Sequence, residues 1–360
     1  MRIAVTGPDG FIAWHTRCAA RARWGGDLVG VGPAEFADED LLAATLADVD
    51  AVIHLAGINR AADDAEIAEV NPGLAQRLVT ALRGRDVPVI YGNSIHSNGD
   101  SVFGVAKRKA AEILGASVPL VDVVLPNIFG EQGRPHYNSV VATFSHLIAR
   151  GEQPNLVDDK QLPLLHVQRA AQIMLDQAVA PMPGRIDVDG RLSWVSEVLE
   201  RLQAMAADYR TGLLPDLADP FTRDLFNTYR GYTFPDSFPI YPPVNSDPRG
   251  GLVEAVKAQG GQTQVFYSST NPGFTRGQHY HLRKVERFLV VAGQAQIRLR
   301  KLFTDEVVAF DVSGDRPAII DMPTMWVHSI TNTGQGELTT LFYADELYDP
   351  HRPDTYPEEV

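Results

Sequence analysis

The first half of the chain alternates short apolar runs with longer segments in which apolar residues recur at the spacing of a helix. Side chains repeat every second residue on a strand and about every 3.6 residues on a helix, so the two patterns predict strands and helices respectively. Strands that alternate with helices are typical of a doubly wound parallel sheet, with helices on both faces. The expected strands are residues 2–6, 27–31, 51–55, 88–91 and 121–125, and the expected helices are residues 11–22, 67–82, 104–114 and 192–209.

The C-terminal part of the chain has a different pattern. Residues 232–243 are rich in proline and aromatic residues, which excludes a helix there and indicates a linker. After Val244, short alternating runs are separated by Gly, Asn, Asp and Pro, which predicts a β-sandwich or barrel. We therefore expect an α/β domain over residues 1–230, a linker over 231–245 and an all-β domain over 246–360. The expected strands of the all-β domain are residues 262–268, 287–291, 295–302, 306–312, 318–322 and 338–344.

Composition narrows the classes of function. The 360 residues are 44% hydrophobic, which is enough for two cores, and the formal net charge of −13 argues against nucleic-acid or anionic-membrane binding as the main role. Cys18 is the single cysteine, which excludes an intramolecular disulfide and fits a reducing compartment. No apolar run approaches the roughly 20 residues that span a bilayer. The first residues lead directly into an expected strand, so we expect no signal peptide and a cytoplasmic protein.

Three histidines and a glutamate in the all-β part have the spacing of metal ligands. His279 and His281 alternate, so on a strand they point to the same face, and a hairpin partner can bring Glu286 alongside. His328 follows in a later segment. Imidazole and carboxylate groups together suit a divalent metal such as zinc. The alternative interpretation is a set of surface histidines on a β-barrel.

The glycines and prolines around these residues make the pattern more specific. The spacing Gly-x5-His-x-His-x4-Glu-x6-Gly from Gly273 to Gly293, followed by Pro-x4-His-x3-Asn from Pro323 to Asn332, resembles the metal motif of cupins. The resemblance implies a jelly-roll domain. Lys284 matches a lysine of the motif and is a candidate proton carrier or oxyanion partner, with a solvated surface lysine as the alternative. The implied ligands of zinc, or of another divalent metal, are His279, His281, Glu286 and His328.

The turn after the first expected strand suits a dinucleotide. Its glycines permit a tight turn and let backbone N–H groups approach a pyrophosphate at a helix N-terminus, and residues 54–57 form a second loop at a strand end. The loop after the second strand offers only Glu35, and no arginine, to discriminate NAD from NADP. The alternative is a scaffold whose pocket serves packing or binds only a sugar nucleotide. The expected cofactor contacts are Gly7, Gly10, Phe11, Ile12, Leu55, Ala56, Gly57 and Lys107.

These segments resemble the extended short-chain dehydrogenases/reductases, which implies a Rossmann-type domain. Ser94 and Lys107 match the catalytic hydroxyl and lysine of that family. Phe103 stands where the family has the tyrosine that carries a proton, and phenylalanine has no ionisable group. The other residues that we consider for this role are Tyr91, His96, His136 and Tyr137.

Segments along the whole chain resemble capsular polysaccharide enzymes of the CapF type, in which a short-chain reductase is fused to a cupin. They include Leu-Pro-Asn-Ile-Phe-Gly around Asn127, Asp-Pro-Arg-Gly-Gly at residues 247–251, and the ending at residues 347–360. The resemblance implies a homodimer that acts on a UDP-linked 2-acetamido-2,6-dideoxy-4-hexulose. The cupin would epimerise C3, and the reductase would then reduce the C4 ketone with NADPH.

The same resemblance assigns substrate contacts. Asn127 is expected to contact the nucleotide sugar, and Arg134 or Arg169 to meet its diphosphate. Two alternatives stay open. The first is an epimerase without reductase activity, because Phe103 removes the usual acid. The second, of another class, is a sugar-nucleotide binding protein that catalyses nothing.

Overall fold

The computed structural model describes residues 1–360, which form two compact units. The first unit contains Met1–Phe129 and Gln161–Ser193, and the second contains Gly130–Lys160 and Trp194–Val360. Residues after Ser193 belong to the same compact unit as the all-β part, whereas the sequence predicts a first domain that extends to residue 230. That domain boundary stays a prediction. No helix combines the length and the apolar character needed to cross a bilayer.

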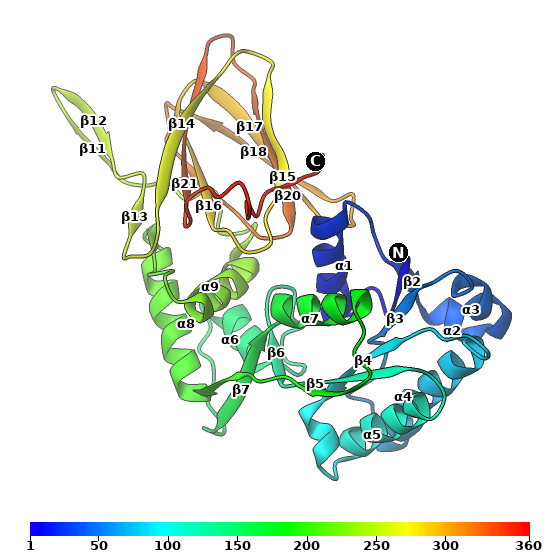
Figure 1. Ribbon diagram of the computed structural model, residues 1–360. Coiled ribbons are helices and arrows are strands. Elements are labelled where there is room, and N and C mark those ends of the chain that lie inside the picture. Colours follow the sequence, from blue (N-terminus) through cyan, green and yellow to red (C-terminus); the bar gives the residue numbers. More distant parts are fainter. The chain divides into compact units, whose positions relative to one another are not determined.

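The first unit is built on a six-stranded sheet in the order β2-β1-β3-β4-β5-β8, and every neighbouring pair is parallel (Figure 1). A smaller sheet has the order β6-β7-β9. The strands are β1 (Ile3–Thr6), β2 (Val29–Val31), β3 (Ala51–His54), β4 (Val89–Ser94), β5 (Leu120–Leu125), β6 (Asn127–Phe129), β7 (Gln161–His166), β8 (Gly184–Asp187) and β9 (Arg191–Trp194). The helices are α1 (Phe11–Trp24), α2 (Pro33–Ala37), α3 (Glu39–Thr45), α4 (Asp64–Ala81), the 3-10 helix η1 (Ile95–Asn98), α5 (Val102–Gly115) and α7 (Val167–Val179).

Helices cover both faces of the large sheet. On one face, α1 and α7 enclose a core with the alternate side chains of the strands, including Ile3, Val5 and Ile53. On the other face, α4 and α5 pack over the intervening side chains, such as Ala4 and Val52. This arrangement confirms the prediction of a Rossmann-like, doubly wound domain. The helix expected at residues 192–209 begins only at Val195, because the preceding four residues form β9.

The second unit contains two antiparallel sheets and three helices. The sheets have the strand orders β14-β21-β16-β19 and β18-β17-β20-β15-β22, and small two-stranded pairs join β10 to β13 and β11 to β12. The helices are α6 (Val140–Ala149), α8 (Val195–Tyr209) and α9 (Pro220–Thr233). The strands are β10 (Leu213–Leu214), β11 (Val244–Asp247), β12 (Gly250–Val253), β13 (Lys257–Ala258), β14 (Gln264–Thr270), β15 (Thr275–Tyr280), β16 (Glu286–Ala292), β17 (Gln294–Lys301), β18 (Val307–Ser313), β19 (Ile319–Met322), β20 (Trp326–Asn332), β21 (Leu338–Ala344) and β22 (Tyr356–Pro357).

The two antiparallel sheets share one core, to which β16, β17, β20 and β21 all contribute. The prediction of an all-β C-terminal domain is thus confirmed. The segment expected as a linker lies against this core. α9 continues to Thr233, three residues into that segment, and the rings of Phe234 and Phe238 then pack on the core. The Phe234 ring lies 4.8 Å from that of Trp326, centroid to centroid.

A buried ion pair joins the helices of the second unit to its β-sheet. Arg287 on β16, only 1% exposed, donates two hydrogen bonds to Asp321 on β19, at 2.6 and 2.9 Å. The hydroxyl of Tyr209 on α8 donates to the same carboxylate at 2.7 Å. Arg287 also donates to the carbonyl of Gly212, just after α8. A buried charge is tolerated only when it is paired and hydrogen-bonded, so these contacts fix α8 against the sheet.

We expect Asp321→Ala to destabilise the second unit by about 3–5 kcal/mol, because it leaves the Arg287 guanidinium buried without its partner. Tyr209→Phe, which removes one hydrogen bond, should cost about 1 kcal/mol. Denaturant-dependent hydrogen exchange of the β16 and β19 amides measures both effects. The double variant Arg287→Met with Asp321→Leu should be more stable than Asp321→Ala, and a less stable double variant would contradict this account.

Candidate functional site

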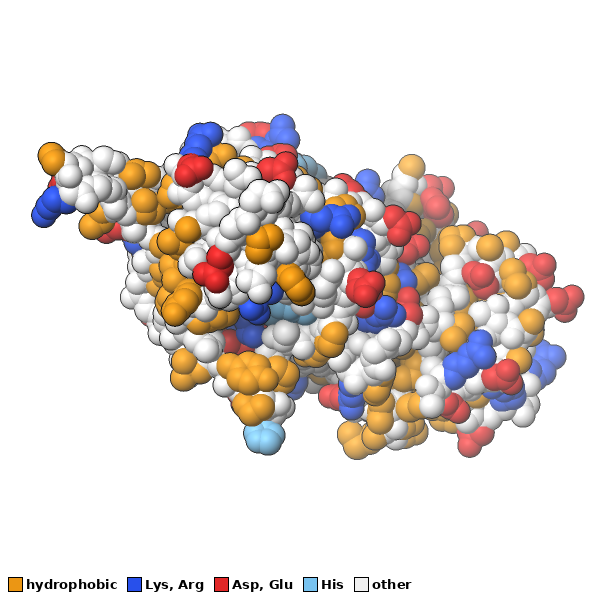
Figure 2. All heavy atoms as spheres, turned by 90° about the horizontal axis from the view of Figure 1, so that it is seen from above, with side chains coloured by type: hydrophobic (Ala, Val, Ile, Leu, Met, Phe, Trp, Pro, Cys, Tyr) orange, Lys and Arg blue, Asp and Glu red, His pale blue; other side chains and the backbone are white.

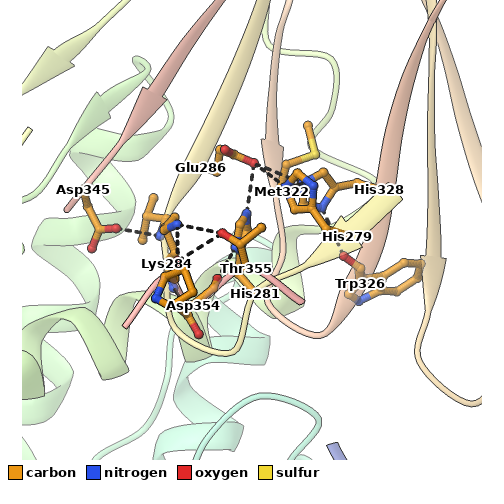
Figure 3. A network of polar contacts seen from close by, with 12 residues as sticks. His279, His281, Lys284, Glu286, Met322, Trp326, His328, Asp345, Asp354 and Thr355 are labelled. Atoms are coloured by element: carbon orange, nitrogen blue, oxygen red, sulfur yellow. Dashed lines mark hydrogen bonds and ion pairs between the residues drawn. The ribbon is translucent and has the colours of Figure 1, made fainter. Parts of the chain in front are cut away.

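Three strands of the second unit carry the residues expected to bind a metal. His279 lies near the end of β15, His281 directly after it, Glu286 at the start of β16, and His328 on β20. His279 and His328 are cross-strand partners. Figure 3 shows that the four side chains point toward one another. Their candidate donor atoms all lie within 4.8 Å of one another.

An irregularity in β15 sets the direction of the histidines. The register with β20 shifts between Gly277 and His279, and Gln278 has a φ of 58°. Gly277 has a φ of 92°, and a Cβ there would lie 2.8 Å from the His328 carbonyl oxygen, so only glycine fits. Past this bulge the alternation resumes. Tyr280 turns away and packs against Tyr356, while both histidines face the cluster.

The distances within the cluster are short. The Oε2 atom of Glu286 lies 3.1 Å from His281 Nε2 and 3.0 Å from His328 Nε2. The Nε2 atoms of His279 and His328 are 3.2 Å apart. Three of the four residues are buried, and His279 is the exception, with 21% of its side chain exposed. The cluster can therefore be reached from solvent on the side of His279.

The outer nitrogens of two of the imidazoles face backbone carbonyls. His281 Nδ1 lies 2.5 Å from the Asp354 oxygen, and His328 Nδ1 lies 3.2 Å from the Trp326 oxygen. These bonds place a proton on each Nδ1, so in the neutral ring each Nε2 carries a lone pair aimed into the cluster. Nε2 lone pairs that face a carboxylate form a donor set that suits a divalent cation.

Burial and neighbouring charge set the protonation of the cluster. Burial, with a smaller effect of His279, lowers the pKa of His328 to about 4, so His328 is neutral near pH 7. Burial alone would raise the pKa of Glu286, but the histidines around it, above all His281, hold that pKa well below its usual range. Burial opposes the protonation of His281, yet Glu286 raises its pKa overall. Because its pKa is lowered, Glu286 is an anion near pH 7.

Lys284 lies beside the cluster but is held by the C-terminal segment. Its Nζ donates to the Pro353 carbonyl at 2.8 Å and to Thr355 Oγ1 at 3.1 Å (Figure 3). The side chain is buried, which excludes the alternative of a solvated surface lysine. Two of the three ammonium protons are thus engaged.

In the first unit, the glycine turn and the second loop lie against each other. Gly7 has a φ of 65°, and a Cβ there would lie 3.2 Å from Ala56 Cα. Thr6 Oγ1 accepts hydrogen bonds from the N–H groups of Leu55 and Ala56. Helix α1 begins at Phe11, and no side chain caps its N-terminus. Its first N–H groups are available to a phosphate, which fits the expected dinucleotide. The structure brings Gly7, Gly10, Phe11, Ile12, Leu55 and Ala56 to this turn, and Gly57 follows in the second loop.

Ser94 and Lys107 belong to neighbouring elements of the first unit. Ser94 is the last residue of β4, and its Oγ accepts the His96 N–H at 3.3 Å. Lys107, on α5, is buried, donates from Nζ to the Gly92 carbonyl at 2.7 Å, and lies 4.1 Å from the centre of the Tyr91 ring. Burial lowers the pKa of Lys107 to about 7. Near neutral pH this lysine is therefore charged only in part.

Phe103 precedes Lys107 by one turn of α5 and brings no hydroxyl. Among the substitutes that we considered, Tyr91 is buried in the core, its hydroxyl donates to the Lys107 carbonyl, and burial raises its pKa. His96 is exposed on η1, with its ring 6.3 Å from that of Phe103. His136 and Tyr137 belong to the second unit.

The expected substrate contacts fall in different units. Asn127 begins β6 in the first unit and is half-buried, with Nδ2 3.4 Å from the Pro163 carbonyl oxygen. Arg134 is exposed in the second unit, with its guanidinium 5.0 Å from the centre of the Tyr137 ring. Arg169 lies on α7 in the first unit.

The residues that hold the metal-ligand candidates in place were not predicted from the sequence. Asp354 contacts the loop between His281 and Glu286 from about 70 positions away. Asn227 and Arg230 reach the same loop from α9. Asp354 lies between a proline and a threonine, a sequence typical of a turn. No local pattern therefore indicates that it holds the loop between His281 and Glu286.

The chain is similar to known proteins of polysaccharide biosynthesis. Residues 245–356 match the family described as the polysaccharide biosynthesis C-terminal domain. The chain is 32% identical over 369 residues to a UDP-2-acetamido-2,6-beta-L-arabino-hexul-4-ose reductase from Pseudomonas aeruginosa, covering 99% of this chain and 98% of that protein. A crystal structure of the capsular polysaccharide assembling protein CapF from Staphylococcus aureus is 29% identical, covers 100% of both chains and has a TM-score of 0.60. The UDP-N-acetylglucosamine 4-epimerase from Bacillus cereus, 19% identical, shares the fold over 57% of this chain and 82% of that chain, with a TM-score of 0.51.

A Rossmann-like unit joined to an antiparallel β unit of the polysaccharide biosynthesis type defines a class of nucleotide-sugar-modifying enzymes. Within this class, the chain belongs to the CapF-type family of capsular polysaccharide enzymes.

The lowered pKa of Lys107 leads to a pH-dependent stability. The unfolded lysine titrates near 10.5 and the folded one near 7, so the cost of burying it is complete below pH 7 and disappears above pH 10.5. The stability of the wild type relative to Lys107→Met should therefore rise between pH 7 and 10, by at most about 1.4 kcal/mol per pH unit. Denaturant unfolding of both proteins at several pH values measures this slope. The exposed neighbour Lys109 supplies the control, since Lys109→Met should show no slope, and a flat difference for Lys107→Met would refute the assignment.

Proposed function

We propose that this protein is a bifunctional nucleotide-sugar enzyme. Its C-terminal β domain, a cupin-type jelly roll, epimerises C3 of a UDP-linked 2-acetamido-2,6-dideoxy-4-hexulose, and its Rossmann-like domain reduces the C4 ketone with NADPH or NADH. The observation that carries the proposal is the convergence of His279, His281, Glu286 and His328. The name of the Pseudomonas aeruginosa relative supports a UDP-linked 4-keto sugar as the substrate.

The donor set fits zinc or another divalent cation, with His279, His281, Glu286 and His328 as its ligands. A divalent metal held by these residues would supply a Lewis acid for the C4 carbonyl, which would make the neighbouring C3–H more acidic. Because His279 is the only partly exposed ligand, the sugar would enter on its side. His281 and His328 are held by backbone carbonyls, so they keep their lone pairs directed inward without reorganisation.

Epimerisation also needs a base that removes the C3 proton from one face of the sugar ring and an acid that returns a proton to the other face. We propose Lys284 as the acid, since it lies beside His281 and keeps one ammonium N–H beyond its two hydrogen bonds. The bonds to Pro353 and Thr355 fix the direction of the side chain, which favours transfer to one face of the sugar ring.

For the Rossmann-like unit, we propose that the glycine turn at Gly7 and Gly10 and the loop at Leu55–Gly57 hold the dinucleotide. The uncapped N-terminus of α1 fits its pyrophosphate. Lys107 would orient the nicotinamide ribose, and Ser94 would donate a hydrogen bond to the C4 oxygen. Asn127 would contact the nucleotide sugar, with Arg134 or Arg169 at its diphosphate.

A second candidate is an epimerase whose Rossmann-like unit binds a nucleotide but reduces nothing. One observation favours it. Phe103 replaces the hydroxyl that would protonate the C4 oxygen, and Tyr91 turns its own hydroxyl into the backbone of α5. The assignment of the reductase activity therefore depends on a direct test.

We also propose a cytoplasmic homodimer. Strand β14 is an edge of its sheet and exposes the large side chains of Val265, Phe266 and Tyr267, the last being 75% exposed. The nearby hairpin β11–β12 also carries hydrophobic side chains and projects at the left of Figure 2. An apolar open edge favours pairing with a second copy, which sedimentation equilibrium would detect as a doubled mass. Cys18, the single cysteine, is buried and forms no disulfide, which fits a reducing compartment.

Solvent deuterium uptake tests the epimerase. In heavy water, metal-loaded protein should introduce deuterium at C3 of the 4-keto sugar nucleotide without NAD(P)H, and metal-stripped protein should not. Glu286→Gln, which removes a charged ligand, should lower the exchange rate by at least about 100-fold. The exposed Glu306→Gln should leave it unchanged. Lys284→Met should slow exchange while the metal stays bound. An exchange rate that stays the same after metal removal would contradict a metal-dependent epimerase. Metal binding without any exchange would favour a non-catalytic binding protein.

Phe103→Tyr tests the reductase. We expect weak NAD(P)H oxidation by the wild type and a gain of about 100-fold on restoring the hydroxyl, because positioned acids contribute about 10²–10⁴-fold. Absorbance of the reduced cofactor measures the rate, and Phe103→Leu serves as the control without a hydroxyl. Efficient reduction by the wild type, unchanged in Phe103→Tyr, would show that another group supplies the proton.

A further inference from the structure

The loop between the second histidine and the glutamate of the cluster is held by carboxylates through its backbone. Asp354 accepts hydrogen bonds from the N–H groups of Leu282, Arg283 and Lys284, at 3.2, 3.0 and 2.8 Å. Asp345 accepts the next one, from Val285, at 2.8 Å. Four consecutive N–H groups are therefore bound by two carboxylates. Charged acceptors form stronger hydrogen bonds than neutral ones, so this loop has little freedom.

The backbone of Asp354 serves the same site. Its carbonyl faces Nδ1 of His281, the contact that directs His281 Nε2 toward the cluster. The residue is 1% exposed and has a φ of 41°, a conformation that aspartate tolerates better than most residues. This conformation lets one residue aim its carbonyl at the histidine and its carboxylate at the loop that follows.

Helix α9 holds the opposite, carbonyl side of the loop. Asn227 donates to the Arg283 carbonyl at 2.7 Å, and Arg230 donates to the Lys284 carbonyl at 3.4 Å. Arg230 also donates at 2.9 Å to the carbonyl of Met322, which is the cross-strand partner of Glu286. The loop is thus fixed on both sides by groups that belong to other parts of the chain.

We infer that Asp354 is a positioning residue of the metal site, which sets the geometry and the affinity of the site without touching the ion. This role rests on the proposed metal binding, and it adds a residue that controls how tightly the metal is bound. The carboxylate of Asp354 fixes the spacing between His281 and Glu286, and its carbonyl fixes the tautomer of His281. Groups that orient metal ligands in this way typically contribute about 10–100-fold to metal affinity.

Asp354→Asn is the direct test. The amide keeps the shape but replaces one acceptor by an N–H₂ that faces the donors of the loop, and it removes the charge. We expect the affinity for zinc, measured by competition with a chromophoric chelator, to fall about 10–100-fold. The absorption spectrum of the cobalt-substituted protein should change as well, since it reports the ligand geometry directly.

Asp349→Asn is the matched control. It makes the same chemical change at an exposed position five residues earlier, where the carboxylate bonds only the His351 N–H. Its zinc affinity and cobalt spectrum should equal those of the wild type. All measurements are made well below the unfolding temperature of each variant, so that a loss of stability alone does not alter them.

The outcomes separate this inference from the proposed function. If the wild type binds neither zinc nor cobalt, the proposed metal site fails and the inference with it. If the wild type binds and Asp354→Asn binds within about threefold with the same spectrum, the positioning role is refuted while metal binding stands.

Hydrogen exchange of metal-stripped wild type gives a test that needs no variant. Amides 282–285 should exchange slowly, because the carboxylates hold them before any metal binds. Rapid exchange there would overturn the inference even if Asp354→Asn does not fold.

Discussion

Lone pairs that face one another in a buried site raise the free energy of the folded state. The second unit of this protein contains such a site at His279, His281, Glu286 and His328. His281 and His328 use their outer nitrogens on backbone carbonyls, and their inner nitrogens then converge on the Glu286 carboxylate. Unpaired buried acceptors cost several kcal/mol unless a proton or a cation lies between them. A divalent ion satisfies all of them at once, and the chemistry proposed for this protein depends on that requirement.

Successive side chains of β16 point to opposite faces of the sheet, which separates the metal-ligand candidate from the residue that anchors the unit. Glu286 faces the cluster, while its neighbour Arg287 points to the helices and forms an ion pair with Asp321. Their cross-strand partners on β19 are adjacent too, and Met322 contacts Arg230 of α9 through its carbonyl. The same two strands thus carry a functional face and an anchoring face. Helix α9, which precedes the all-β part in the sequence, thus supports the loop between His281 and Glu286.

The sequence is most informative where chemistry is local. Strand–helix alternation predicted the parallel sheet, and the His-x-His-x4-Glu spacing predicted which residues meet, because both depend on short periods. Residues 192–194 were misassigned to a helix because Leu192 and Trp194 fit either period, and pairing with β7 decides for a strand. Asp354 lay beyond prediction, since its partners are about 70 residues away and only the fold brings them together. The packing of α8 against the β-sheet depends likewise on the buried Arg287–Asp321 pair, whose two residues are 34 positions apart, so no local sequence pattern indicates it.

We propose above all that four side chains of the β unit share one cation. A crystal structure recorded at the absorption edge of the bound metal tests it most directly. We expect a single strong anomalous peak bonded to His279, His281, Glu286 and His328 at about 2.0–2.2 Å. Absence of a peak there in metal-supplemented crystals, or a peak at other residues, would contradict it.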